Sequence, residues 1–155
     1  MSGLQRNPKI VVFAGPNGSG KSTFTNLLKP AMDYINADEI KKKGYFIRCF
    51  YILTADPMIN VFRVKARVEA GGHDVPKDKI ISRYDKALEL VHEVVSVCDI
   101  CHIYDNSEDR PYRIYKKRKG QSYFDVCDDW AKEDIFLLTL DKNAEEQDLN
   151  RNWNN

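Results

Sequence analysis

The feature that most constrains the fold is a glycine-rich stretch directly behind a short apolar run. Residues 10–14 read Ile-Val-Val-Phe-Ala, and residues 15–23 read Gly-Pro-Asn-Gly-Ser-Gly-Lys-Ser-Thr, which fits the pattern G-x-x-x-x-G-K-[ST]. In this pattern a buried strand leads into a loop that cradles phosphate and then into a helix. A chance match is the alternative, but the strand-like and helix-forming flanks favour the motif. The sequence therefore predicts a phosphate-binding P-loop behind a central strand.

The residue types of this loop indicate what each part does. Glycines let the backbone turn tightly enough for successive N–H groups to face an anion. From this pattern we expect Lys21 to reach the β- and γ-phosphates of a nucleotide, Ser22 to offer its hydroxyl to Mg²⁺, and Thr23 to begin the helix. The predicted nucleotide-binding residues are Gly15, Asn17, Gly18, Ser19, Gly20, Lys21, Ser22 and Thr23.

Composition predicts a single soluble α/β domain. The chain has 155 residues, of which 43% are apolar and 30% charged, and its formal net charge is +1. That charge gives no global attraction to nucleic acid or anionic lipid. No window approaches the ~18 apolar residues of a membrane span, and no signal-peptide core is present, so we expect a cytoplasmic protein. The domain is expected over residues 1–140, and residues 141–155 are polar enough to predict a disordered tail.

Four cysteines do not change this expectation. Cys98 and Cys101 form a C-x-x-C pair, which in principle suits a redox site or half of a zinc site. A second pair with suitable spacing is missing from the sequence. We therefore expect reduced thiols at Cys49, Cys98, Cys101 and Cys127, the first three packed as small hydrophobes.

Periodicity predicts a mostly parallel sheet flanked by helices. Strands are expected at 9–14, 34–37, 45–53 and 100–104, helices at 21–29, 58–70 and 77–97, and a short terminal element of unassigned type at 135–140. A parallel connection from 34–37 to 45–53 needs a crossover of about a dozen residues, and only about seven are present. The connection between these two predicted strands is therefore too short for a parallel crossover.

A basic β-hairpin is predicted near the end of the domain. Residues 113–116 and 122–126 flank the turn Lys117-Arg118-Lys119-Gly120. Lysines at such a tip are typical of an exposed sheet edge that must resist aggregation. The alternative is a grip on nucleic acid, for which Lys116, Lys117, Arg118 and Lys119 are the candidates.

Asp38 distinguishes a kinase from other phosphate-binding proteins. At the end of the predicted strand 34–37 its carboxylate can take the proton of an attacking hydroxyl, whereas a helix-capping or solvent-facing Asp is the alternative. Glu39 is the weaker neighbour. The N-K-x-D motif of GTPases and the signature of ABC ATPases are absent from the sequence. We therefore expect a small-molecule kinase.

Arginines on two predicted helices are candidates for a catalytic lid. Arg63, Arg67 and Arg83 flank the sequence Gly71-Gly72-His73. A glycine hinge between arginine-bearing helices can lay guanidinium groups over a transferring phosphoryl group. Solvated arginines on polar faces are the alternative, and His73 is more often a turn residue than a catalyst.

Together these residues resemble the zeta-toxin family of P-loop kinases over roughly residues 8–128. The matching segments are residues 15–23, Ile35–Glu39, Arg67–Pro76, Arg83-Tyr84 and Tyr104–Ser107. The resemblance implies a nucleoside-kinase-like α/β fold and transfer of the γ-phosphate of ATP to a hydroxyl of a UDP-N-acetylamino sugar. It implies Asp38 as the base, lid arginines at Arg67 and Arg83, and an antitoxin protein as a partner.

One departure from this family stands out. Between Asp38-Glu39 and Gly44-Tyr45 the family carries a much longer segment that helps to bind the acceptor sugar, and here only residues 40–43 remain. This indicates a natural deletion, an engineered one, or residues missing from the sequence. Two functions stay open: a magnesium-dependent kinase, or a nucleotide-binding module that has lost acceptor binding and turnover. A nucleic-acid kinase that uses the basic hairpin is a third option.

Overall fold

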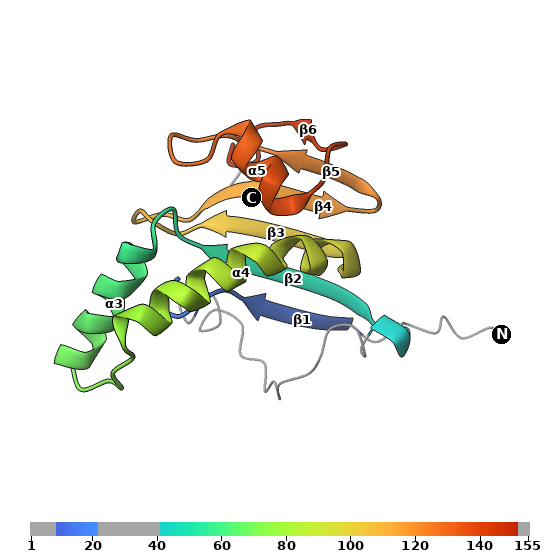
Figure 1. Ribbon diagram of the computed structural model, residues 1–155. Coiled ribbons are helices and arrows are strands. Elements are labelled where there is room, and N and C mark those ends of the chain that lie inside the picture. The colour runs from blue at the N-terminus through green and yellow to red at the C-terminus, as the bar shows by residue number, and fades with distance from the viewer. Residues whose placement is uncertain (1–8, 22–40, 152–155) are drawn as a thin grey trace.

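The computed structural model describes residues 9–21 and 41–151, which form an α/β fold built on one six-stranded sheet (Figure 1). The strands are β1 (Lys9–Ala14), β2 (Phe46–Leu53), β3 (Ile100–Asp105), β4 (Tyr112–Arg118), β5 (Gln121–Phe124) and β6 (Glu145–Glu146), and they lie in this order across the sheet. β1, β2 and β3 are mutually parallel, and β6 is parallel to β5. β4 runs antiparallel to both of its neighbours.

Three helices accompany the sheet in the described part of the chain: α3 (Pro57–Glu69), α4 (Lys77–Val97) and α5 (Lys132–Thr139). α4 lies across β2 and β3, α5 lies over the later strands, and α3 extends beyond the sheet alongside α4 (Figure 1). Asp56 caps α3 as predicted, since its carboxylate accepts a hydrogen bond from the Met58 N–H at 2.8 Å. The predicted boundaries of α3 and α4 are confirmed to within one residue. None of the described helices has the length and apolar character needed to cross a bilayer.

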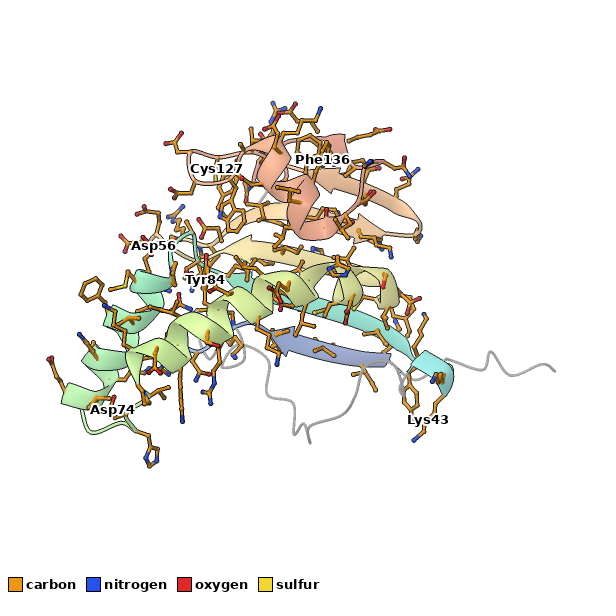
Figure 2. The ribbon with its side chains drawn as sticks, in the orientation of Figure 1. Lys43, Asp56, Asp74, Tyr84, Cys127 and Phe136 are labelled. Carbon is orange, nitrogen blue, oxygen red and sulfur yellow. The ribbon has the colours of Figure 1, made fainter. Side chains whose placement is uncertain are left out.

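The main core lies between the sheet and the helices α4 and α5. Alternate residues of the strands face it, which is the period of two expected for a half-covered sheet. Its fully buried members include Ile47, Cys49, Leu53, Val91, Cys101, Ile103, Ile114, Tyr115 and Ile135. Tyr84 fastens α4 to the loop behind β2, because its hydroxyl donates to the Thr54 carbonyl at 2.6 Å (Figure 2). The expected reduced thiols are confirmed, with Cys49, Cys98 and Cys101 buried.

Two positional predictions need correction. β1 was expected to be buried and central, but its residues are half-buried or exposed and it lies at one end of the described sheet. The strand expected at 34–37 falls outside the described residues, so β2 is the one neighbour seen for β1. The basic hairpin is confirmed as β4 and β5, but it does not lie at the sheet edge, because β4 pairs with β3 and β5, and β5 pairs with β6.

Residues 141–151, predicted to belong to a disordered tail, are ordered. β6 pairs with β5 and Leu149 is buried. Asn150 fixes this segment, since its side-chain amide donates to the Arg113 carbonyl at 3.0 Å and to Asp125 at 2.9 Å. A few specific hydrogen bonds thus hold a segment whose overall polarity resembles that of a disordered chain.

His102 lies in an aromatic row on the side of the sheet that α4 and α5 do not cover. Its ring stacks on Phe50 with the centroids 5.1 Å apart, and Phe50 stacks on Phe13 at 5.3 Å. Burial, reinforced by the nearby Arg113 guanidinium, lowers the pKa of His102 from its ordinary 6.5 to about 3. The imidazole is therefore neutral in the folded protein at neutral pH.

We expect this histidine to weaken the fold in acid. Because its folded pKa is depressed, its stabilising contribution is complete above pH 6.5 and is lost as the pH falls toward 3. Between pH 7 and pH 5 the free energy of unfolding should fall by about 1–2 kcal/mol more in the wild type than in His102→Gln. Urea unfolding of both proteins at several pH values measures this difference. Equal pH dependence in the two proteins would show that His102 titrates normally.

Candidate functional site

The glycine loop, residues 15–21, has a backbone that only glycine adopts easily. Gly15, Gly18 and Gly20 have φ values of +145°, +78° and +93°. A Cβ atom on Gly15 would lie 2.2 Å from the Ile52 carbonyl oxygen, and one on Gly18 would lie 2.6 Å from the Asn60 carbonyl oxygen. The loop is therefore packed directly against β2 and α3, so its glycines are required by space as well as by conformation.

Side chains from α3 and from the end of β3 hold three successive carbonyl groups of this loop. The Asn60 amide donates to Asn17 O at 2.8 Å, and the Asn106 amide donates to Ser19 O at 3.0 Å. Arg63 Nη1 donates to Gly18 O at 3.3 Å. In a trans peptide the N–H points opposite to the C=O, so the N–H groups of Gly18 and Gly20 point away from these partners. An anion on the side of the loop away from Asn60 and Asn106 can accept hydrogen bonds from these N–H groups.

Asn60 and Arg63 are themselves fixed. Asn60 is fully buried, and its side-chain oxygen accepts a short hydrogen bond from the Thr54 hydroxyl. Arg63 Nη2 also donates to the Asn106 carbonyl at 2.6 Å. Thr54 and Asn106 follow the carboxyl ends of β2 and β3, which is the edge where open parallel sheets bind their ligands. The loop is thus braced by a connected polar network.

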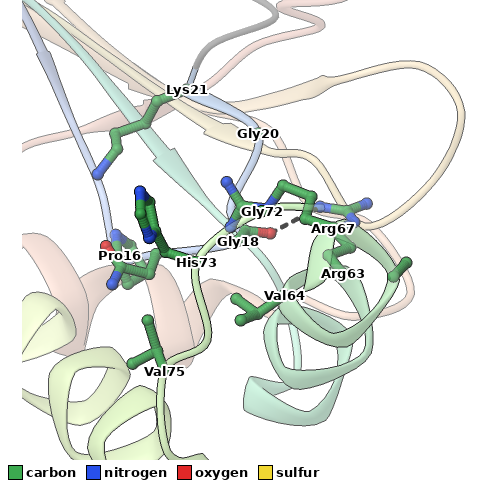
Figure 3. Close-up of a pocket in the computed structure, with 12 residues that line it drawn as sticks. Pro16, Gly18, Gly20, Lys21, Arg63, Val64, Arg67, Gly72, His73 and Val75 are labelled. Atoms are coloured by element: carbon green, nitrogen blue, oxygen red, sulfur yellow. Dashed lines mark hydrogen bonds between the residues drawn. The ribbon is translucent and has the colours of Figure 1, made fainter. Parts of the chain in front are cut away.

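A pocket of about 640 Å³ opens beside the glycine loop. Lys21, Pro16 and His73 lie on one side of it, and Gly18 and the α3 residues Arg63 and Arg67 lie on the other (Figure 3). The full lining is Pro16, Asn17, Gly18, Gly20, Lys21, Arg63, Val64, Ala66, Arg67, Gly72, His73 and Val75. This volume suits a small organic ligand the size of a nucleotide.

Lys21 is held in an electropositive setting. Its Nζ donates to the Gly15 carbonyl across the loop. Burial, and secondarily the Arg67 guanidinium, lower the pKa of Lys21 below its ordinary value. A bound anion would relieve the repulsion between Lys21 and Arg67, so the pair favours a negatively charged ligand.

No family model, curated protein or solved structure matches this chain. The geometry of its own residues therefore carries the functional argument.

The structure separates the three arginines proposed for a lid. Arg67 lines the pocket. Arg63 also lines it, but its guanidinium is engaged by backbone carbonyls and braces the loop. Arg83 is exposed on α4 and does not contribute to the pocket lining. His73 lies at the pocket rim in the turn behind Gly72, whose N–H bonds Arg67 O at 2.7 Å.

Several predicted site residues lie outside the described residues: Ser22, Thr23, Asp38 and Glu39. Among the described residues, no group of three or more His, Cys, Asp or Glu side chains is arranged to hold a metal ion. The described lining of the pocket contains the cations Lys21, Arg63 and Arg67, and cationic side chains bind phosphate.

Sequence reasoning missed Asn60 and Thr54, and it misjudged what Arg63 does. A signal was available for Asn60, because it lies four residues before Val64 and so on the buried face of an amphipathic helix. A polar residue at such a position needs hydrogen-bond partners inside the protein. The identity of those partners depends on how α3 meets the loop, which the sequence does not specify.

Proposed function

We propose that this protein is an ATP-dependent small-molecule kinase whose glycine loop is a P-loop. The observation that carries the proposal is the convergence of Lys21 and Arg67 on one pocket beside a glycine loop with braced carbonyls. The pocket supplies positive charge, and the glycine loop beside it supplies backbone N–H groups; both kinds of group stabilise a transferring phosphoryl group. The loop also follows the carboxyl end of a parallel strand, where nucleotides bind in P-loop proteins.

In the proposed reaction a hydroxyl oxygen of the acceptor bonds to the γ-phosphorus, and the bond to the β–γ bridging oxygen breaks to leave ADP. The hydroxyl proton passes to Asp38, and Lys21 and Arg67 stabilise the charge on the phosphoryl oxygens. Mg²⁺ bound at Ser22 would neutralise charge on the phosphates. The family resemblance suggests a UDP-N-acetylamino sugar as the acceptor and an antitoxin as a partner.

A second candidate is a nucleotide-binding module without turnover. The short connection before β2 favours it, because only residues 40–45 separate Glu39 from Phe46, the first residue of β2. The corresponding segment in the zeta-toxin family contributes to the acceptor site. Under this candidate Mg·ATP binds and phosphoryl transfer is absent.

Calorimetric titration with Mg·ATP and a transfer assay on UDP-N-acetylamino sugars test both candidates. We expect Lys21→Ala to weaken Mg·ATP binding at least tenfold, about 1.4 kcal/mol, because it removes the positive charge that the glycine loop itself carries. Lys65→Ala is the matched control, since Lys65 is exposed on α3 outside the pocket. Binding without transfer selects the second candidate. Equal affinity in the wild type and Lys21→Ala would refute both.

A further inference from the structure

A second cavity, of about 420 Å³, lies at the opposite end of the parallel strands from the glycine loop. Its wall is formed by the first residue of β1, the start of β2, the junction between α4 and β3, and the tip of the β4–β5 hairpin. The glycine loop begins after Ala14, and this cavity contains Lys9. A strand of that length separates the two sites by roughly 17 Å, so the cavity and the glycine-loop pocket are two separate sites.

The basic cavity, as we call it, concentrates positive charge. Its basic residues are Lys9, Lys41, Arg48, Lys117, Arg118 and Lys119, and Asp99 is its one acidic residue. The whole chain has a formal net charge of only +1. The six positive charges around the basic cavity repel one another, and a bound anion reduces that repulsion.

Asp99 offsets only part of this charge. One of its oxygens pairs with Lys41 Nζ at 2.6 Å, and the other accepts from the Ile47 N–H at 2.8 Å. Within the described ranges, this is the single ion pair. Lys117 Nζ donates to the Val95 carbonyl at 2.7 Å in the last turn of α4. Arg48, Arg118 and Lys119 are exposed and contribute positive charge at the mouth of the cavity.

A buried thiol in the cavity wall reflects the same field. A hydrogen bond with Cys49 lowers the pKa of Cys98, and burial opposes this; the positive charges of Lys117 and Lys41 lower the pKa, and the negative charge of Asp99 raises it. The lysines thus favour negative charge at a group inside the wall.

Protection of a sheet edge does not account for the cations that belong to β4. Lys117 and Arg118 belong to β4, which is paired on one side with β3 and on the other with β5. A strand paired on both sides presents no open edge to another chain. The two cations of β4 therefore call for a different explanation.

We propose that the basic cavity binds a compact oligophosphate group. Cations from separate segments surround one hollow, which suits a small anion with several charges, whereas an extended polymer requires a basic track. One arginine can donate two parallel hydrogen bonds to phosphate oxygens, and each lysine contributes a single point charge. Phe46 gives the cavity an apolar wall, with Lys9 Nζ 6.0 Å from the centre of its ring.

Tripolyphosphate is the probe, titrated by calorimetry into the wild type and into Lys21→Ala. We expect two sites in the wild type and one in Lys21→Ala, because tripolyphosphate can also occupy the glycine loop. In the Lys21→Ala background, Arg48→Gln with Lys119→Gln should weaken the remaining site at least tenfold. The matched control removes two exposed lysines elsewhere, by Lys65→Gln with Lys142→Gln. Thermal unfolding checks that each variant folds.

Three results would overturn the proposal. If the Lys21→Ala variant folds and does not bind tripolyphosphate, the basic cavity is not a binding site for this anion. Equal loss in the control pair would mean that general surface charge attracts the anion. An oligothymidine that binds more tightly than tripolyphosphate, with affinity rising with its length, would mean that the cavity belongs to a nucleic-acid track. If Lys21→Ala does not fold, the same comparisons are made with Arg48→Gln and Lys119→Gln introduced into the otherwise wild-type chain, where unchanged tripolyphosphate binding contradicts the proposal.

Discussion

Gly15→Ala is expected to lower the free energy of unfolding by about 3 kcal/mol. The new methyl group would lie 2.2 Å from the Ile52 carbonyl oxygen, which belongs to the backbone of β2 and cannot rotate away. The φ of +145° adds strain, since residues with a side chain rarely adopt it. Urea unfolding followed by circular dichroism measures the change.

Gly71→Ala separates these two causes. Gly71 also has a positive φ, +94°, but a Cβ atom there would have no neighbour within 4 Å. We expect Gly71→Ala to lower the free energy of unfolding by about 1 kcal/mol, because only the left-handed conformation destabilises this variant. Equal losses at Gly15 and Gly71 would contradict the close packing of the glycine loop against β2.

Asn60→Ala should cost about 2–3 kcal/mol of stability and also weaken Mg·ATP binding. Asn60 is fully buried, so the substitution leaves the Asn17 carbonyl and the Thr54 hydroxyl without their shared partner. The loop then loses one of the three hydrogen bonds that α3 and Asn106 make to its carbonyl groups, and a less ordered loop binds an anion less tightly. Unfolding and calorimetric titration measure the two effects.

Asn150→Ala is the matched control for this double effect. Asn150 also uses its amide to hold backbone and side-chain oxygens, but its partners Arg113 and Asp125 belong to β4 and the segment after β5. It should reduce stability and leave Mg·ATP affinity unchanged. If both variants lower affinity to the same degree, the loss follows from reduced stability and the bracing role of Asn60 is wrong.

Local patterns predicted most of the described elements because their signals are local. The apolar repeat of α4, the Asp56 cap of α3 and the β-branched run of β1 depend on neighbours within a few residues. Long-range pairing determined what the patterns missed. The position of the hairpin inside the sheet depends on β6, a strand of two residues without a recognisable pattern of its own.

The candidate site was predictable in part for the same reason. The motif singled out Lys21 and the loop glycines, and the predicted Gly71-Gly72 hinge singled out Arg67, which lines the same pocket as Lys21. Arg63 and Arg83 have the same chemistry in the sequence, yet one braces the loop and the other is exposed. Only the path of each helix past the loop distinguishes them, and that path follows from packing between distant segments.

The bonds from α3 to the loop have a consequence for motion. Asn60 and Arg63 connect the helix directly to loop carbonyls, so a ligand that orders the loop must also slow the local opening of α3. By reciprocity, a change that destabilises α3 weakens ligand binding by the same free energy. Amide hydrogen exchange along α3 would therefore report occupancy of the glycine loop from a distance.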